Sequence, residues 1–286
     1  MNLEKNITEC AFHIKPDKNG ICMEDEVANE LIKHAANIKK ITATNKKDVI
    51  TELKKVYNCE TESCLLENDE IINALGKDTV LEQLKTRFKP EGPYDSFDWF
   101  SNSNIDDVLE QVEEKYKDKH FLHIEFQMRD FEAVGSKLAR TDLAEEYRKG
   151  IRCFGVVFNT DYSSGRGQHW FSIFGDFSGK GTDEDPLTIE YFNSSGDSPL
   201  PQILSWMKKT KDHMNKELNK TVKCLYDIKI ANQSDNHSCG SYALYFILSR
   251  LAGITYDHFR NNKIGDETMH EFRKMHLFRR PKIAKT

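Results

Sequence analysis

The chain has 286 residues and a formal net charge of -5, and 38% of its residues are hydrophobic. That length suits one large or two modest domains, and that hydrophobic share can fill a core. A surface that generally binds nucleic acid needs concentrated Lys and Arg, so the acidic balance argues against a specific nucleic-acid partner. Residues 1–20 lack the apolar stretch of a secretory signal, and the longest apolar run, 242–248, is too short to cross a membrane. We therefore expect a soluble protein that is made in the cytoplasm and has no membrane partner.

The first third of the chain predicts a small helical region. Apolar residues recur at helical spacing across residues 25–41 and 45–57, and two shorter helices are expected at 67–76 and 78–87. Two prolines and a glycine within residues 89–93 then mark a break. We therefore expect a helical arm domain over residues 1–88 and a second domain over residues 89–286.

The chain contains seven cysteines, so at least one is unpaired. Because no secretory signal is found, reduced thiols are the simpler expectation. Cys59 and Cys64 form a close pair, but no second pair with zinc-ligand spacing follows. We expect no metal and no cofactor, and at Cys59 and Cys64 either a local disulfide or two thiols at helix ends.

The second domain predicts strands flanked by helices. A capped helix is expected from residue 102, with Asn104 or Asp106 as the cap. Residues 151–158 and 169–177 have strand character, and the glycines of the loop between them suit a hairpin. Further strands are expected at 187–192 and 222–230, and a C-terminal helix at 266–279. Strands with helices at both ends predict the α+β class.

Cys239 directly precedes the apolar run 241–251, and a thiol at the start of a buried helix is a candidate nucleophile. A cysteine attacks as its thiolate, so it needs a lowered pKa, which a neighbouring imidazolium and the positive end of a helix dipole can supply. His169 is the candidate imidazole. Asn193 closes a predicted strand and is placed to orient that ring without taking its proton.

An oxyanion hole needs hydrogen-bond donors beside the sulfur. Gln233, six residues before the thiol, and the backbone N–H of Cys239 are the candidate donors, and Gly240 is expected to leave room for substrate backbone. Each residue alone has a commonplace interpretation, since a free cysteine is usually a buried apolar residue and Asn before Ser-Ser-Gly is an ordinary turn residue. Their order and spacing carry the hypothesis.

The order His169, Asn193, Gln233, Cys239 and the Trp that follows the histidine resemble the adenovirus-protease and ubiquitin-like-protease clan of cysteine peptidases. Within that clan the segments 158–170 and 189–199, with Cys-x4-Cys at 59–64, are similar to the African swine fever virus polyprotein-protease family. The resemblance runs from about residue 57 to residue 278. It implies a papain-like core in which helices flank a central mixed sheet and the nucleophile starts a buried helix.

The resemblance also implies roles for the matched residues. In the family the matched His, Asn and Cys are catalytic and the matched Gln lines the oxyanion hole. Many relatives in the wider clan have Asp where this chain has Asn193, so a neutral orienting residue leaves more of the thiolate activation to His169 and the helix. The family's tryptophan after the histidine, here Trp170, roofs a channel that selects glycines, and Trp99 is a candidate for the opposite wall.

The implied activity is that of a cysteine endopeptidase that cleaves viral structural polyproteins after Gly-Gly during virion maturation, in the host cell cytoplasm and the virion. An isopeptidase that acts on ubiquitin or a SUMO-like modifier would use the same machinery. A same-fold acyltransferase is a further alternative, although the sequence shows neither an inositol-phosphate site nor an acyl-CoA signature. A scaffold with an inactive site is disfavoured because all four functional positions are filled.

Overall fold

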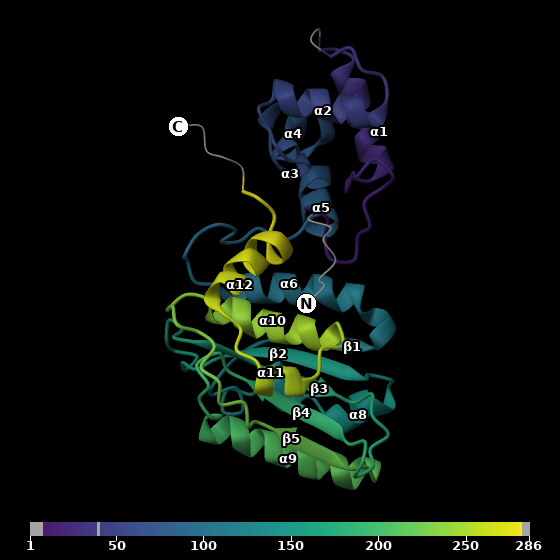
Figure 1. Cartoon of the computed structure of the whole chain (residues 1–286). Coiled ribbons are helices and arrows are strands. Elements are labelled where there is room, and N and C mark those ends of the chain that lie inside the picture. Colours follow the sequence, from purple (N-terminus) through teal and green to yellow (C-terminus); the bar gives the residue numbers. More distant parts are fainter. Residues whose placement is uncertain (1–7, 39–40, 282–286) are drawn as a thin grey trace. The chain divides into compact units, whose positions relative to one another are not determined.

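The computed structural model describes residues 8–38 and 41–281, and the chain divides into two compact units (Figure 1). The core unit is residues 97–272, and the arm unit joins the chain up to Ser96 with the chain from Arg273 onward. These bounds differ from the expected ones, because the first segment continues past residue 88 and the C-terminal end lies with the arm.

The arm unit is built from five helices within the described residues: α1 (Asp25–Ala35), α2 (Lys46–Val56), α3 (Glu62–Leu66), α4 (Asp69–Leu75) and α5 (Lys77–Arg87). Four of them match the predicted helices, whereas the short α3 was not predicted. The first helix ends at Ala35 and not at residue 41, and residues 39–40 lie outside the described part of the chain. Apolar faces meet in one core that includes Leu31, Leu53, Leu65 and Phe88.

The end of the described chain packs into the arm unit. The predicted helix at 266–279 is divided into α12 (Asp266–Phe272) and a π-helical turn, η2 (Arg273–Leu277). The ammonium of Lys89 donates to the carbonyl oxygen of Met275 at 2.7 Å, and the backbone N–H of Arg279 donates to the carbonyl of Pro90 at 3.1 Å. Phe278 is fully buried. These contacts explain why the C-terminal end belongs to the arm.

Four of the seven cysteines form two disulfides in the arm unit. Cys10 pairs with Cys22 and Cys59 pairs with Cys64, with Cα atoms 5.2 and 5.5 Å apart. The remaining thiols are those of Cys153, Cys224 and Cys239. The expectation of reduced thiols is therefore wrong for Cys10 and Cys22, because the fold brings two cysteines twelve residues apart within bonding distance. At residues 59 and 64 the disulfide alternative holds.

The core unit is organised on a five-stranded sheet whose strands follow chain order: β1 (Phe121–Met128), β2 (Cys153–Asn159), β3 (Trp170–Asp176), β4 (Leu187–Phe192) and β5 (Val222–Leu225). Strand β1 is parallel to β2 and β4 is parallel to β5, whereas β3 is antiparallel to both of its neighbours, β2 and β4. This arrangement confirms the α+β class, the mixed sheet and the hairpin between the second and third strands. The first strand was not predicted, and the last ends at Leu225 and not at residue 230.

Helices cover both faces of this sheet. Figure 1 shows α6 (Asn102–Lys115) and α10 (Cys239–Leu251) on one face and α9 (Pro201–Leu218) on the other. Ser101 caps α6 by accepting from the backbone N–H of Asn104, whose side chain accepts from Ser101 N–H in return, so Ser101 and neither predicted residue is the cap. The shorter elements are η1 (Lys117–Lys119), α7 (Lys137–Arg140), α8 (Leu143–Arg148) and α11 (Tyr256–Asn261).

Helix α10 is buried on nearly all sides and is fixed along its length. The ring of Phe246 stacks on Phe192 of β4 with centroids 4.8 Å apart. Near its C-terminus, the Arg250 guanidinium donates to Glu190 at 2.6 Å and to Asp176 at 3.0 Å. These contacts hold the C-terminal half of the helix against β3 and β4.

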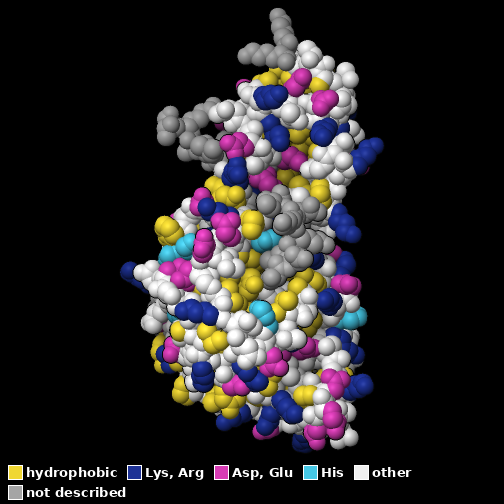
Figure 2. Space-filling model, in the orientation of Figure 1, with side chains coloured by type: hydrophobic (Ala, Val, Ile, Leu, Met, Phe, Trp, Pro, Cys, Tyr) yellow, Lys and Arg dark blue, Asp and Glu magenta, His cyan; other side chains and the backbone are white. Residues whose placement is uncertain are grey.

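The surface carries mixed charge. On the face shown in Figure 2, basic and acidic side chains are interspersed, as the small net charge predicts. Within residues 8–38 and 41–281, no helix combines the length and the apolar character that a bilayer crossing requires.

Candidate active site

Cys239 is the first residue of α10 and is only 3% exposed. The backbone N–H groups of Trp170, Gly240 and Cys239 itself favour the charged form of its sulfur. Burial raises the pKa of the thiol, and the three N–H groups lower it by less. The pKa of Cys239 is therefore raised, whereas a lowered pKa was expected, because desolvation disfavours the thiolate. A base must therefore accept the proton before this sulfur can attack.

His169 and Asn193 are joined by a short hydrogen bond. The Nε2 atom of His169 lies 2.6 Å from the Oδ1 atom of Asn193. Oδ1 also accepts the backbone N–H of Ser195 at 3.1 Å, while the amide nitrogen donates to the Tyr191 hydroxyl at 3.2 Å. Those two partners identify Oδ1 as the acceptor, so Nε2 carries the hydrogen. The neutral ring then has a bare Nδ1 that can take a proton.

The histidine and the thiol approach the same peptide group. His169 lies directly before β3, where its carbonyl accepts the backbone N–H of Thr160 at 2.9 Å. The next backbone N–H, that of Trp170, is one of the groups that favour the thiolate of Cys239. Asn193 follows β4, the neighbouring strand. The fold thus gathers three residues that are far apart in the sequence at one end of the sheet.

Gln233 is placed differently from its expected position. Its amide nitrogen donates to the backbone carbonyl of Asp235 at 3.0 Å and to the Asp235 carboxylate at 3.1 Å. Its amide oxygen accepts from the Ser194 hydroxyl at 2.8 Å. The side chain therefore serves the loop before α10, and in this arrangement its N–H groups point to Asp235 and not to the sulfur.

Gly240 has a packing role that the sequence did not predict. A Cβ atom at this position would lie 2.6 Å from the ring of Phe100, which is closer than such atoms pack. The space beside Gly240 is therefore filled by Phe100 and is not open for substrate, which corrects the expectation. Glycine here lets α10 approach the segment that leads into α6.

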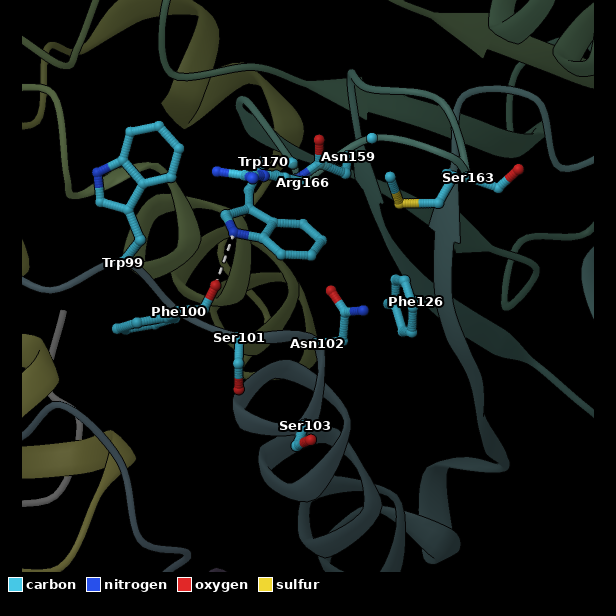
Figure 3. Close-up of a pocket in the computed structure, with 13 residues that line it drawn as sticks. Trp99, Phe100, Ser101, Asn102, Ser103, Phe126, Asn159, Ser163, Arg166 and Trp170 are labelled. Carbon is cyan, nitrogen blue, oxygen red and sulfur yellow. Dashed lines mark hydrogen bonds between the residues drawn. The ribbon is translucent and has the colours of Figure 1, made fainter.

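Trp170 and Trp99 line the same groove, which has a volume of about 520 Å³. Trp170 is buried, and its indole N–H donates to the carbonyl oxygen of Phe100 at 3.2 Å. Trp99 is half exposed. Figure 3 shows the two indole rings beside the first turn of α6, with Phe126 of β1 further along the groove. The groove thus begins at a residue whose backbone N–H favours the thiolate of Cys239.

Two supporting residues were missed by sequence reasoning. Tyr191 and Ser195 hold the Asn193 amide from both sides, each only two residues away in the chain. Alternation in a strand places Tyr191 on the same face as Asn193, so the spacing offered a signal for Tyr191. The turn after the strand gave no comparable signal for Ser195.

Known proteins similar to this chain are viral cysteine proteases. No model of a known protein family matches the sequence. The cysteine protease of African swine fever virus is 33% identical over 288 residues, which cover 95% of each chain. In another isolate of that virus a relative with 33% identity and the same coverage is named SUMO-1 cysteine protease. A protein of Acanthamoeba polyphaga mimivirus that is named as a thiol protease is 22% identical over 249 residues, which cover 83% of this chain and 76% of that protein.

The structural comparison agrees with these relatives. The crystal structure of the African swine fever virus protease matches with a TM-score of 0.81 and 30% sequence identity, over 97% of both chains. A selenomethionine crystal structure of the same viral protease gives a TM-score of 0.79 at 29% identity and the same coverage. The chain therefore belongs to the family of the African swine fever virus cysteine protease, and it is itself a cysteine protease.

Proposed function

We propose that this protease cleaves viral structural polyproteins after Gly-Gly during virion maturation, with Cys239 as the nucleophile, His169 as the base and Asn193 as the orienting residue. The observation that carries the proposal is the hydrogen bond from His169 to Asn193, beside a thiol at the start of α10. That bond leaves Nδ1 of His169 as the atom that can accept the thiol proton.

The proposed reaction has two halves. Nδ1 of His169 takes the proton, the thiolate attacks the substrate carbonyl carbon, and the imidazolium returns the proton to the leaving amine as the C–N bond breaks. A thioester between Cys239 and the substrate acyl group remains. Water then attacks this thioester while His169 removes a proton from it, and the C–S bond breaks. The imidazolium returns that proton to the Cys239 sulfur, and the acid product leaves. Asn193 keeps the ring in one orientation and accepts from Nε2 throughout.

The oxyanion needs donors at the thiol. The backbone N–H of Cys239, at the N-terminus of a 13-residue helix, is one proposed donor. The amide of Gln233 is the proposed second donor, and it must leave Asp235 to act in that way. The loop that holds it lies next to the nucleophile in the chain, and rotation of the Gln233 side chain away from Asp235 is the required change.

The groove supports the preference for glycine. Trp170 is buried and its indole is tied to the Phe100 carbonyl, so it cannot easily turn aside for a bulky side chain. Trp99 lines the same groove. A substrate with glycines before the scissile bond presents no side chain to these two rings, which is why we propose Gly-Gly-x sites, with action in the host cell cytoplasm and the virion.

Digestion of defined peptides tests this proposal. Wild-type protein and the Cys239→Ser variant are incubated with a peptide library that contains Gly-Gly-x and matched Ala-Gly-x and Gly-Ala-x sequences, and the products are identified by mass spectrometry. We expect cleavage after Gly-Gly by the wild type and a loss of several orders of magnitude in the variant. Equal cleavage of the alanine peptides would exclude the proposed specificity, and retained activity of Cys239→Ser would exclude the nucleophile.

A second candidate function is removal of a ubiquitin-like modifier. The name of one relative, SUMO-1 cysteine protease, favours it. The same machinery would serve, since such an enzyme cleaves an isopeptide bond at the modifier's C-terminus. Parallel incubation with SUMO precursors and with isopeptide-linked conjugates separates the two functions: rapid release of the modifier, with little cleavage of Gly-Gly-x peptides, would favour the deconjugase.

The arm unit is proposed to dock the polyprotein substrate. Within the described residues none of the proposed catalytic groups lies in it. Remote binding energy positions a long substrate, so removal of the arm should impair cleavage of a polyprotein more than labelling of Cys239 by iodoacetamide. The comparison needs a protein of residues 97–272, because removal of residues 1–88 alone would leave the C-terminal part of the arm unit without partners such as Glu67, whose carboxylate accepts from Arg279 at 2.9 Å. Equal retention of both rates would exclude a docking role.

A further inference from the structure

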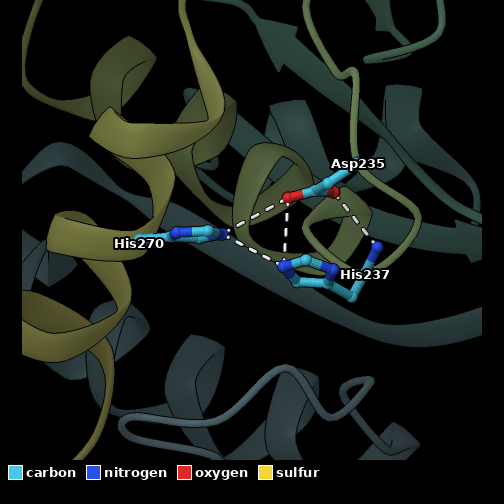
Figure 4. A group of neighbouring side chains, drawn as sticks. All are labelled: Asp235, His237 and His270. Atoms are coloured by element: carbon cyan, nitrogen blue, oxygen red, sulfur yellow. Dashed lines mark hydrogen bonds and ion pairs between the residues drawn. The ribbon is translucent and has the colours of Figure 1, made fainter.

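Three side chains next to the loop of the nucleophile form a nearly equilateral triangle of ligand atoms (Figure 4). Nε2 of His237 lies 3.1 Å from Nε2 of His270 and 3.1 Å from Oδ2 of Asp235. Nε2 of His270 lies 3.3 Å from the same carboxylate oxygen. Asp235 and His237 precede α10, whereas His270 comes from α12, so the sequence gave no indication of the group.

Protons alone cannot satisfy this triangle. If both ring nitrogens carry hydrogen, both can donate to Asp235, but the two N–H groups then face each other at 3.1 Å. If one nitrogen is bare, it can accept from the other N–H, but it still lies beside the carboxylate oxygen at 3.1 or 3.3 Å. If both are bare, their lone pairs face each other. The Asp235 carboxylate accepts the Ser238 hydroxyl at 2.6 Å and the backbone N–H groups of His237 and Ser238 at 3.1 and 2.9 Å, so its oxygens serve as acceptors. Every protonation state leaves at least one repulsive contact.

A single cation at the centre would satisfy all three contacts at once. Zinc bonds of about 2.0–2.2 Å to nitrogen and oxygen place tetrahedral ligand atoms about 3.3–3.5 Å apart, close to the separations found here. We propose that Asp235, His237 and His270 bind a divalent transition-metal ion, with Zn²⁺ as the preferred ion and water in the fourth position. Because only three of the four ligands come from the protein, we expect the ion to exchange, so the fraction of protein that holds it depends on the concentration of free metal.

The surroundings hold these ligands in place. Oδ1 of Asp235 accepts the backbone N–H groups of His237 at 3.1 Å and Ser238 at 2.9 Å, which aims Oδ2 at the triangle. Nδ1 of His237 lies 3.4 Å from Oδ1 of Asn236, an acceptor that favours hydrogen on Nδ1 and therefore a lone pair on Nε2, the atom that would bind the metal. The ring of Phe97, which is itself exposed, packs against His237 and His270 with centroids 4.7 and 5.5 Å away and so supports both rings from one side.

The proposed ion acts as a clamp. It ties the loop of residues 233–238 to the middle of α12, in addition to the hydrogen bonds that the backbone N–H groups of Ser234 and Asp235 donate to the Asp266 carboxylate at 3.0 and 3.1 Å. Asp235 also receives both hydrogen bonds from the Gln233 amide, so the clamp extends to the proposed oxyanion donor. The ion takes no part in the peptide-bond chemistry. The inference goes beyond the proposed function and can be tested without substrate.

Metal binding is measured on the full-length Cys239→Ser protein, because the thiol beside His169 is itself a potential ligand for Zn²⁺. Isothermal titration with Zn²⁺ and absorption spectroscopy with Co²⁺ give the affinity, stoichiometry and coordination. We expect one ion per chain and the visible bands of a tetrahedral Co²⁺ site without sulfur. His270→Ala and His237→Ala should each weaken binding by at least about tenfold. With Zn²⁺ bound, amides of residues 234–238 should exchange with solvent more slowly.

A matched control is His213→Ala. His213 also faces a carboxylate, with Nε2 3.1 Å from Asp142, but the structure shows that pair without a third ligand in the described chain. Its loss should leave the affinity unchanged. Thermal unfolding without metal confirms that each variant is folded. Absence of stoichiometric Zn²⁺ binding, or an affinity unaffected by His270→Ala, overturns the proposal. Loss of binding in His169→Ala alone would place the ion at the candidate active site and also overturn it.

Discussion

Nε2 of His169 and Oδ1 of Asn193 are 2.6 Å apart, and Asn193 is buried, with 5% of its surface exposed. The amide of Asn193 is in turn held by Ser195 N–H and by the Tyr191 hydroxyl. The orientation of the imidazole is therefore fixed by a neutral residue whose own rotation is blocked. A neutral partner aligns the ring but adds no charge to stabilise an imidazolium.

Replacement of Asn193 should cost less activity than replacement of His169. We expect Asn193→Ala to lower kcat/KM roughly tenfold to a hundredfold, equal to about 1.4–2.7 kcal/mol, because alignment is lost. His169→Ala removes the proton carrier and should cost roughly 10²- to 10⁴-fold. Asn193→Asp should keep substantial activity, with the acid limb of the pH–rate profile moved to higher pH because a carboxylate stabilises the imidazolium. Equal and complete loss in all three variants would mean that Asn193 does more than orient the ring.

Tyr191→Phe tests whether the tyrosine hydroxyl helps to hold Asn193 in place. The change removes the hydroxyl that accepts from Asn193 Nδ2 and keeps the ring that packs against Phe171 at 5.3 Å. We expect kcat to fall by less than about tenfold with KM unchanged, since one hydrogen bond contributes about 0.5–1.5 kcal/mol. Steady-state kinetics separate the two constants. A rise in KM with unchanged kcat would point to substrate binding and contradict the positioning role.

Gln233→Ala distinguishes an oxyanion donor from a loop anchor. Loss of an oxyanion donor should lower kcat by roughly 10²- to 10³-fold. Alkylation of Cys239 by iodoacetamide forms no oxyanion, so its rate should stay close to that of the wild type. If the Gln233 bonds to Asp235 serve only to hold the loop, both rates should fall together. Comparison of the two rate constants on the same preparations decides between the roles.

Phe278→Ala should destabilise the arm unit by about 3–5 kcal/mol, the usual cost of emptying the space of a buried phenylalanine. Phe278 is 1% exposed, and its ring occupies the space in which a Cβ at Gly92 would lie. The free energy of unfolding from urea titration measures the effect. Leu81→Ala is the control, because Leu81 in the same unit is 53% exposed and its loss should change stability by no more than about 0.5 kcal/mol. Equal effects in the two variants would contradict the role of Phe278 as a core residue.

The stability of the arm unit should fall between pH 5 and pH 8 because of Glu62. Burial raises the pKa of Glu62 from 4.5 to about 7, and the N–H groups of Cys22 and Met23 lower it by less. A raised carboxyl pKa contributes stability that is present below about pH 4.5 and is lost as the pH rises through about 7. Glu62→Gln should remove most of this slope, on the order of 2 kcal/mol.

Denaturant titrations at pH 5, 6, 7 and 8 measure the slope. The exposed Glu82 on the same unit provides the control, since Glu82→Gln should keep the pH dependence of the wild type. A wild-type stability that does not change over this range would show that Glu62 titrates at its ordinary value.

The sequence by itself determined those helices whose apolar residues recur at a regular spacing along a short stretch of chain. The helical periodicity of residues 45–57 and the apolar run after Cys239 predicted α2 and α10, because a buried face repeats with the period of the helix. The order of His, Asn and Cys, with the tryptophan after the histidine, was enough to indicate the peptidase family. The β1 strand was missed although its sequence carries the signal of a strand: polar residues at 123, 125 and 127 alternate with apolar residues at 122, 124, 126 and 128.

Other features depended on tertiary packing. Burial and three backbone N–H groups set the pKa of Cys239, and these come from β3 and α10 together. Gly240 packs against Phe100, a residue 140 positions away, so its role could not be read from its neighbours in sequence. The same is true of the contact between His237 and His270. Sequence order fixes which groups are present, whereas distances between distant segments exist only once the sheet and its helices have folded.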